Sequence, residues 1–312
     1  MRGLELARAY YEQFGAPMIH EQFPQIEGLI ACGLAGSGSE CFGYDDEISR
    51  DHDFDPGFCL FVPEDLIDSR TLFRLSRAYA KLPEEFEGCR RQRLSPVGGN
   101  RRGVLEIGEF FQTRIGRPDG LAGDLDWFRV PEAYLAEATN GAVFRDDLGR
   151  FTAIREGLRT MPENVRRKKL AGHVLLMAQA GQYNYSRCLA HRETGAAQLA
   201  VGEFVSHAMA AAFLLSRRYE PFYKWRFRAL RELPEWPGLA EDLETLLTTG
   251  NDPETAEVKT QSIEAISARV LAELKRQGLT DGSGEFLEPH AYRINETISS
   301  AQIRTLHILY AV

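Results

Sequence analysis

Two acidic residues in the first third of the chain are suited to binding a metal ion. Asp51 and Asp53 are separated by a single residue. In an extended segment, residues two apart point to the same face, so both carboxylates would project together. Carboxylate oxygens are hard ligands, and Mg²⁺ is usually held by one or two of them together with substrate phosphates. The spacing therefore indicates a magnesium site that takes a phosphorylated substrate.

A segment rich in glycine and serine precedes these acids. Residues 36–39 have the sequence Gly-Ser-Gly-Ser and follow an apolar run, residues 29–34, that predicts a buried strand. Glycines let the backbone turn tightly and approach a ligand, while amides and hydroxyls bind phosphate. Such a segment alone is often a solvated loop. Its combination with the preceding strand, Gly43 and the paired acids favours a phosphate site.

Together these residues resemble the signature of the DNA polymerase beta-like nucleotidyltransferase superfamily. That signature consists of a Gly-Ser pair, a further glycine, a serine and an Asp-x-Asp pair. The corresponding residues are Gly38, Ser39, Gly43, Ser49, Asp51 and Asp53. Arg50 stands between Ser49 and Asp51, whereas the usual pattern has serine directly before aspartate. The resemblance of this motif covers roughly the first third of the chain.

The resemblance implies a reaction and its cofactors. A nucleoside triphosphate, with ATP favoured, would bind its phosphates against Gly38 and Ser39, with Ser49 in the same nucleotide-binding motif. Two Mg²⁺ ions would bind Asp51 and Asp53. A hydroxyl group of an acceptor would then attack the α-phosphorus and release pyrophosphate.

The superfamily also implies a third carboxylate from a later strand, which completes the metal site or acts as the general base. Glu106 lies in a predicted strand, residues 103–107, and fits that place. Glu109 is the second choice. A glutamate on an edge strand facing water is an equally good interpretation of Glu106, so the assignment remains open at this stage.

Length and composition are those of a globular protein with two domains. The chain has 312 residues and a formal net charge of −8, which argues against a dedicated polynucleotide-binding protein. Five scattered cysteines argue against a zinc site or a disulfide framework. We find neither a signal sequence nor an apolar run long enough to span a membrane, so we expect a cytoplasmic protein.

Periodicity predicts an α+β fold with two domains. Helices are expected at residues 3–22, 65–81 and 109–116, and strands at 28–34, 58–62 and 103–107. A glycine-rich stretch, residues 116–123, predicts the domain boundary. Beyond it only helices are expected. The prediction is a nucleotidyltransferase-type mixed sheet with helices in residues 1–122 and an all-α bundle in residues 123–312.

The helical half carries a second resemblance. Residues 141–146 and 217–225 resemble stretches of a bacterial family known only as a domain of unknown function within this superfamily. Those proteins pair the transferase domain with a helical bundle, as aminoglycoside nucleotidyltransferases do. In the latter a lysine of the helical domain reaches the triphosphate. This implies a nucleotide-binding role for Lys224 and its neighbour Tyr223. The alternative is a surface lysine packed on aromatic rings.

The acceptor is less well specified. A small hydroxylated molecule is the first expectation, because the chain is acidic and the second half is helical. Five arginines would serve a protein or tRNA acceptor or form a solvated surface: Arg90, Arg91, Arg93, Arg101 and Arg102. The competing class is a catalytically degenerate module that binds a nucleotide or a partner protein. The histidines show no ligand spacing, and we expect packing or surface roles for them.

Overall fold

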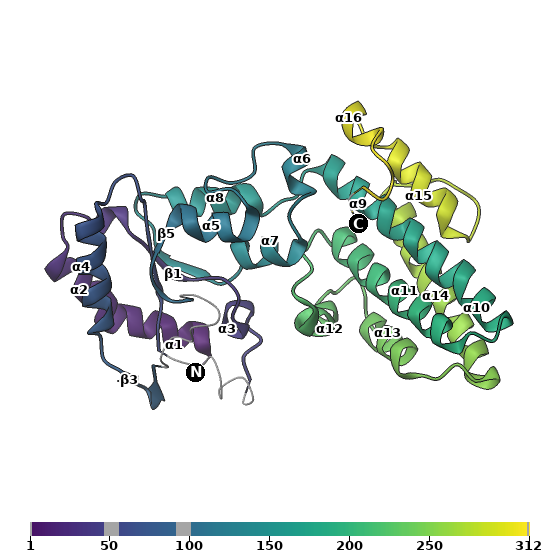
Figure 1. The fold of residues 1–312 in the computed structure, drawn as a ribbon, viewed down its shortest axis with the longest axis horizontal. Helices are drawn as coiled ribbons and strands as arrows, with labels where there is room; N and C mark the ends of the chain where they lie inside the picture. Colours follow the sequence, from purple (N-terminus) through teal and green to yellow (C-terminus); the bar gives the residue numbers. More distant parts are fainter. Residues whose placement is uncertain (1, 47–55, 92–100, 311) are drawn as a thin grey trace. The chain divides into compact units, whose positions relative to one another are not determined.

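The computed structural model describes residues 2–46, 56–91, 101–310 and 312, and it has an α+β fold (Figure 1). The chain forms two compact units. The first contains Met1–Ala122 and Tyr134–Thr160, and the second contains Gly123–Ala133 and Met161–Val312. The chain thus leaves the first unit near the predicted boundary. It then returns for residues 134–160, which the predicted division into 1–122 and 123–312 had placed in the bundle.

A four-stranded mixed sheet organises the first unit, in the order β5-β2-β1-β6. Its strands are β1 (Ala31–Leu34), β2 (Cys59–Val62), β5 (Gly103–Glu106) and β6 (Ala142–Arg145). β1 is antiparallel to β2 and to β6, whereas β2 and β5 are parallel. A separate hairpin is formed by β3 (Glu85–Phe86) and β4 (Cys89–Arg90).

Helices cover one face of this sheet with an apolar core. α1 (Gly3–Tyr10), the π-helical turn Tyr11–Gly15 and α2 (Ala16–Gln22) follow one another without a break, and α4 (Ser69–Ala80) comes later in the chain. Their buried side chains pack with Phe58, Leu60 and Val62 around β2. A Cβ at Gly15 would collide with the Phe58 ring, so glycine allows this close approach.

The opposite face of the sheet is covered by α5 (Ile107–Ile115) and α8 (Arg150–Leu158) (Figure 1). Phe61 points to this face because its neighbours Leu60 and Val62 point to the other. Its ring stacks on Phe151 of α8, with the ring centroids 3.9 Å apart, and meets Phe110 of α5 edge-on. α8 therefore belongs to the core of the sheet.

β6 corrects the expectation that only helices follow residue 123. The strand pairs with β1 through Gly33 opposite Val143 and Leu34 opposite Ala142. Its four residues follow Asn140-Gly141 and are too few for a clear alternating pattern. Their strand conformation depends on hydrogen bonds to β1, which lies more than a hundred residues earlier in the chain.

The second unit is a bundle of helices. Its longest members are α9 (Glu163–Met177), α11 (Thr194–Leu215) and α14 (Pro253–Arg276), and α9 packs on both α11 and α15 (Leu287–Glu296). A π-helical segment, Ala178–Tyr185, joins α9 to α10 (Ser186–Ala190). The shorter elements are a 3₁₀ turn (Tyr223–Trp225), α6 (Asp124–Trp127), α12 (Arg226–Arg231), α13 (Leu239–Thr248) and α16 (Ala301–Arg304). The boundary between the two units in the sequence falls after residue 133, within α7 (Glu132–Thr139).

α11 is the central apolar helix of this bundle. Its length and composition alone would allow it to cross a membrane, which differs from the expectation drawn from the sequence. Most of its apolar window is buried within the bundle, and core helices of soluble proteins have the same composition. We therefore interpret α11 as the core helix of the second unit, and its composition is only weak evidence for a membrane span.

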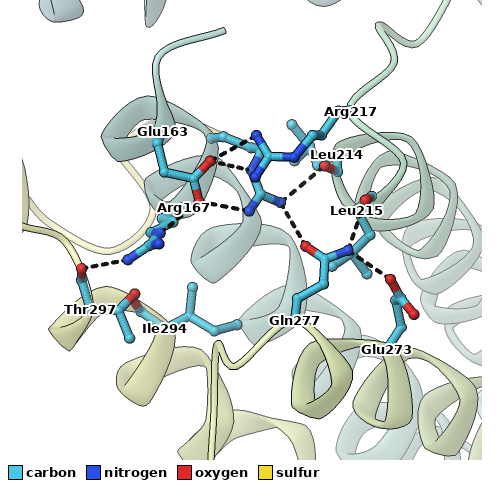
Figure 2. Close-up of polar contacts among 10 residues, drawn as sticks. Glu163, Arg167, Leu214, Leu215, Arg217, Glu273, Gln277, Ile294 and Thr297 are labelled. Carbon is cyan, nitrogen blue, oxygen red and sulfur yellow. Dashed lines mark hydrogen bonds and ion pairs between the residues drawn. The ribbon is translucent and has the colours of Figure 1, made fainter.

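A network of charged groups joins the helix ends of the bundle (Figure 2). Glu163 at the start of α9 accepts hydrogen bonds from Arg166 and Arg167 and forms an ion pair with Arg217. Arg166 also donates to the Leu214 carbonyl, at the end of α11, and to the Gln277 side chain. One carboxylate thus links three arginines and the last turns of two helices.

Candidate functional site

The Gly-Ser segment forms a tight turn at the carboxyl end of β1. Gly36 has φ of +123°, a conformation that glycine adopts without strain. Gly38 precedes the short helix α3 (Ser39–Phe42), and Gly43 ends that helix with φ of +72°. Ser37 is exposed and Ser39 is half-buried. The predicted strand and turn therefore occur in the expected order, and the short helix α3 follows them without having been predicted. In the following paragraphs "the Gly-Ser turn" denotes residues 36–39.

An ion pair lies directly against this turn. Arg102 donates a hydrogen bond to Glu40 over 3.0 Å, and both side chains are nearly buried. The Glu40 carboxylate occupies the space that a side chain at Gly38 would need. Gly38 thus permits the close packing of the Glu40 carboxylate on the backbone of the turn.

Arg114 is a second cation at the turn, and it was not among the site residues predicted from the sequence. α5 runs back along the sheet from Glu106, so its last residues reach the carboxyl end of β1. The guanidinium NH2 group lies 2.8 Å from the position that a Cβ of Gly36 would take. Its Nε atom is buried 3.8 Å from the Glu137 carboxylate. Burial lowers the pKa of Arg114, and the nearby Glu137 opposes that effect.

The charges placed at the turn balance one another. Among the described residues, Arg102 and Arg114 contribute two positive charges, and Glu40 and Glu137 contribute two negative charges. A triphosphate carries several negative charges, so this neutral environment by itself gives it little electrostatic attraction. Phosphate binding here would depend on cations supplied with the nucleotide.

The acidic part of the predicted site cannot be placed beside the turn from the structure. Ser49, Asp51 and Asp53 lie outside the described residues. The described chain resumes at Pro56 and enters β2 at Cys59. Cys59 pairs with Gly33 of β1, three residues before the predicted turn begins.

Glu106 does not lie at the end of the sheet that carries the turn. In the parallel pairing of β2 with β5, Gly103 is opposite Cys59 and Glu106 is opposite Val62. Glu106 is therefore three residues, or about 10 Å, along the strand from the level of Gly33, and the turn lies beyond Gly33 in the other direction. Glu109 is exposed in the first turn of α5, next to Glu106. The place of Glu106 beside Asp51 and Asp53 stays a prediction, because both aspartates lie outside the described residues.

Tyr223 and Lys224 are exposed residues of the second unit, in the 3₁₀ turn after Phe222. The Lys224 ammonium lies 5.0 Å from the centroid of the Trp225 ring, and the rings of Phe222 and Tyr223 are 4.5 Å apart. Lys224 therefore packs on an aromatic ring, as expected from its neighbours, and its ammonium remains accessible to an anion.

Intramolecular contacts account for much of the arginine cluster. Arg91 donates to the carbonyls of Tyr79 and Leu82, Arg102 binds Glu40, and Arg90 pairs with Glu84 on the surface. Arg93 lies outside the described residues, and Arg101 has intramolecular interactions of its own. These contacts give a polynucleotide-binding edge little support.

A cluster of ionisable side chains lies inside the second unit. We refer to it as the polar cluster: Glu132, Lys169, His173, His207, Glu220 and Arg226. Lys169 and Glu132 are almost fully buried and 3.6 Å apart. Arg226 Nε lies 2.9 Å from Glu220 Oε1 without the alignment of a hydrogen bond. Burial raises the pKa of Glu220 to about 7, with Arg226 opposing the effect and Glu132 adding to it.

The two histidines of the cluster contact each other, which their sequence spacing did not predict. His173 Nδ1 and His207 Nδ1 are 2.9 Å apart, and His207 Nε2 is 3.4 Å from the Glu203 carboxylate. Burial lowers the pKa of both rings, so both are neutral at pH 7. A His207 ring protonated at Nε2 would contact Glu203 and accept the Nδ1 proton of His173.

Comparison with known proteins gives one partial match. A family model described as a domain of unknown function, DUF4037, matches residues 127–226. No curated protein and no solved structure matches the chain. The matched range includes β6, α8 and every member of the polar cluster. It also includes residues 141–146 and 217–225, on which the second resemblance rests.

Proposed function

We propose that this protein is a magnesium-dependent nucleotidyltransferase. It transfers a nucleoside monophosphate, AMP in the first instance, from a nucleoside triphosphate to a hydroxyl group of a small molecule. The observation that carries the proposal is the buried strand β1 that leads into the Gly-Ser turn and α3. The Asp-x-Asp pair stands between this turn and β2 in the sequence, as in the superfamily that the motif resembles.

In this proposal the turn binds the nucleotide phosphates. Backbone amides and the Ser39 hydroxyl would donate to phosphate oxygens, since glycine at residues 36 and 38 lets a ligand approach the backbone. Arg114 would add a guanidinium beside Gly36. The resemblance to aminoglycoside enzymes implies that Lys224, with its neighbour Tyr223, binds the nucleotide, with the Lys224 ammonium on the triphosphate.

Asp51 and Asp53 would hold the magnesium ions. Both aspartates lie outside the described residues, so this ligand set is proposed from the sequence. Bound Mg²⁺ would neutralise charge on the triphosphate and on the leaving pyrophosphate. This fits the balanced charge at the turn, which lacks the positive excess that an unchelated triphosphate needs.

Transfer forms one bond and breaks another. The acceptor oxygen bonds to the α-phosphorus, the bond from that phosphorus to the β-phosphate oxygen breaks, and pyrophosphate leaves with the electron pair. The protein contributes chiefly by orientation and by stabilising charge. The resemblance assigns the acceptor proton to Glu106. The position of Glu106 in β5 does not favour that role.

Calorimetric titration with ATP and with GTP, each with and without Mg²⁺, tests the proposal. We expect magnesium-dependent binding to the wild type and none to the Asp51→Asn/Asp53→Asn double variant. Glu21→Gln, an exposed substitution on α2, is the matched control and should bind as the wild type does. Failure of folded wild-type protein to bind any nucleotide, with candidate acceptors also present, would refute the proposal.

The position of Glu106 favours a second candidate function, namely a module that binds a nucleotide without transferring it. With magnesium–nucleotide bound, pyrophosphate release in the presence of hydroxylated acceptors separates the two functions. Release at the wild-type site, lost in the double aspartate variant, supports transfer. Binding without release across sugars, aminoglycosides, tRNA and a protein acceptor supports the module.

A further inference from the structure

One side chain from the returning segment is hydrogen-bonded to both backbone polar groups of Gly36 in the Gly-Ser turn. The Gly36 N–H donates to Asn140 Oδ1 over 2.9 Å, and Asn140 Nδ2 donates to the Gly36 carbonyl over 2.7 Å. The side-chain amide therefore satisfies the backbone donor and the acceptor of a single residue. These bonds hold Gly36 in its positive-φ conformation.

The next residue is bonded to the other end of the turn. The Gly141 N–H donates to the Cys41 carbonyl in α3 over 2.8 Å. Gly141 has φ of +67°, and a Cβ there would collide with the carbonyl of Leu34 in β1. Asn140 and Gly141 thus contact the end of β1, the first residue of the turn and the short helix that follows it.

Asn140 is itself held by surrounding structure. It follows the last residue of α7, and Arg155 of α8 donates to the carbonyls of Thr139 and Asn140 over 3.0 and 2.6 Å. The Arg155 side chain is buried, and burial lowers its pKa to about 10, with the nearby Arg159 adding to the effect. A guanidinium at the carboxyl end of a helix stabilises the exposed carbonyls. Directly after Gly141, β6 pairs with β1.

We propose that Asn140 is a positioning residue that fixes the Gly-Ser turn in the conformation that receives the nucleotide phosphates. This inference rests on the proposed function. A glycine-rich turn samples many conformations, and ordering it on binding would reduce affinity. The paired hydrogen bonds from Asn140 order the turn before the ligand arrives. The ligand that the ordered turn would bind is a magnesium–nucleoside triphosphate. Its affinity for the protein therefore reports on the role of Asn140.

The test compares four proteins by MgATP titration, thermal unfolding and amide hydrogen exchange at Gly36. Asn140→Ala removes both hydrogen bonds. Asn140→Asp keeps an acceptor for the Gly36 N–H, loses the donor and places a negative charge near the phosphates. Asn164→Ala is the control, since Asn164 also accepts two hydrogen bonds, from Ser299 in the second unit.

We expect Asn140→Ala to weaken MgATP binding about 30-fold, or about 2 kcal/mol, because two hydrogen bonds no longer order the turn. Asn140→Asp should weaken it at least as much, and Asn164→Ala should not change it. Exchange at Gly36 should accelerate in Asn140→Ala, which removes the acceptor of its N–H, with exchange at Leu60 in β2 unchanged. Wild-type affinity in folded Asn140→Ala would overturn the proposal.

The exchange experiment separates this inference from the proposed function. If the wild type binds no nucleotide, the transferase assignment fails. The positioning role of Asn140 is then tested by amide hydrogen exchange at Gly36 alone. Slow exchange at Gly36 in the wild type and fast exchange in Asn140→Ala would uphold that role. Equal exchange in the two proteins would overturn it.

Discussion

Phe151 stacks on Phe61 with their ring centroids 3.9 Å apart and their planes 14° from parallel. Both side chains are fully buried. The contact joins α8 to the central strand β2, although the two residues are separated in the chain by Gly123–Ala133, which belongs to the second unit. Residues 134–160 are therefore a structural part of the first unit.

Phe151→Ala should destabilise the first unit by about 3–5 kcal/mol, because it removes a buried aromatic side chain and leaves a cavity. Phe73→Ala is the control; Phe73 is 65% exposed on α4, and its loss should cost less than about 0.5 kcal/mol. All three tryptophans, Trp127, Trp225 and Trp236, lie in the second unit. Denaturation should be followed by circular dichroism and by tryptophan fluorescence, which reports on the second unit only. Equal effects of the two substitutions would contradict the assignment of residue 151 to the core.

Asp53→Asn should abolish transfer, measured as pyrophosphate release, because a metal ligand is lost. Glu106→Gln should stay within about 3-fold of the wild type, since the strand register places Glu106 at the other end of the sheet. Turnover near that of the wild type in Asp53→Asn would exclude the metal site. Loss of transfer in Glu106→Gln would restore Glu106 as the third carboxylate.

Arg114→Ala should weaken MgATP binding by about 10- to 100-fold, the range expected for hydrogen bonds to a charged group. Its guanidinium also packs 3.9 Å from the centroid of the Phe110 ring, so thermal unfolding must accompany the titration. Arg77→Ala, an exposed substitution on α4, supplies the charge-matched control. Unchanged affinity in folded Arg114→Ala would limit Arg114 to a packing role.

Glu220→Gln should change how the stability of the second unit depends on pH. Burial raises the Glu220 pKa from 4.5 to about 7, so the folded protein holds this proton more tightly than the unfolded chain. The resulting stability is present below pH 4.5 and is lost as pH rises through about 7. Relative to the variant, the wild type should lose on the order of 3 kcal/mol between pH 4.5 and 8.

The lowered pKa values of His173 and His207 act in the opposite direction, since they reduce stability as pH falls below 6.5. Both histidines remain in the variant, so the difference between the two proteins isolates Glu220. Tryptophan-monitored denaturation at pH 5, 6.5 and 8 provides the measurement. A difference that does not vary with pH would show that Glu220 titrates normally.

Glu163→Gln should destabilise the second unit at neutral pH but not in acid. Burial alone would raise the pKa of Glu163, but hydrogen bonds from Arg166 and Arg167 lower it to about 2. The stabilisation is therefore present above pH 4.5 and is lost as pH falls towards 2. Because the side chain is 35% exposed, solvent screening reduces the expected effect to about 1 kcal/mol. Denaturation at pH 7 and 2.5, with the exposed Glu257→Gln as control, checks this; an equal loss at both pH values would contradict it.

The sequence by itself determined the α+β class, the strands near residues 31–34, 59–62 and 103–106, and the turn that follows the first of them. These features depend on local information: the period of apolar residues and the conformational freedom of glycine. The same information indicated that Lys224 would pack among aromatic side chains. The nucleotide, the metal and the acceptor rest on the resemblance and remain proposals.

Only the tertiary structure decided which distant residues meet. The return of residues 134–160 to the first unit adds β6 to the sheet and brings Asn140 to Gly36, a pair 104 positions apart. Strand register decided that Arg114, rather than Glu106, lies beside the turn. Helix packing brought His173 to His207. Each of these contacts depends on pairing and packing between elements far apart in the chain, which local periodicity does not encode.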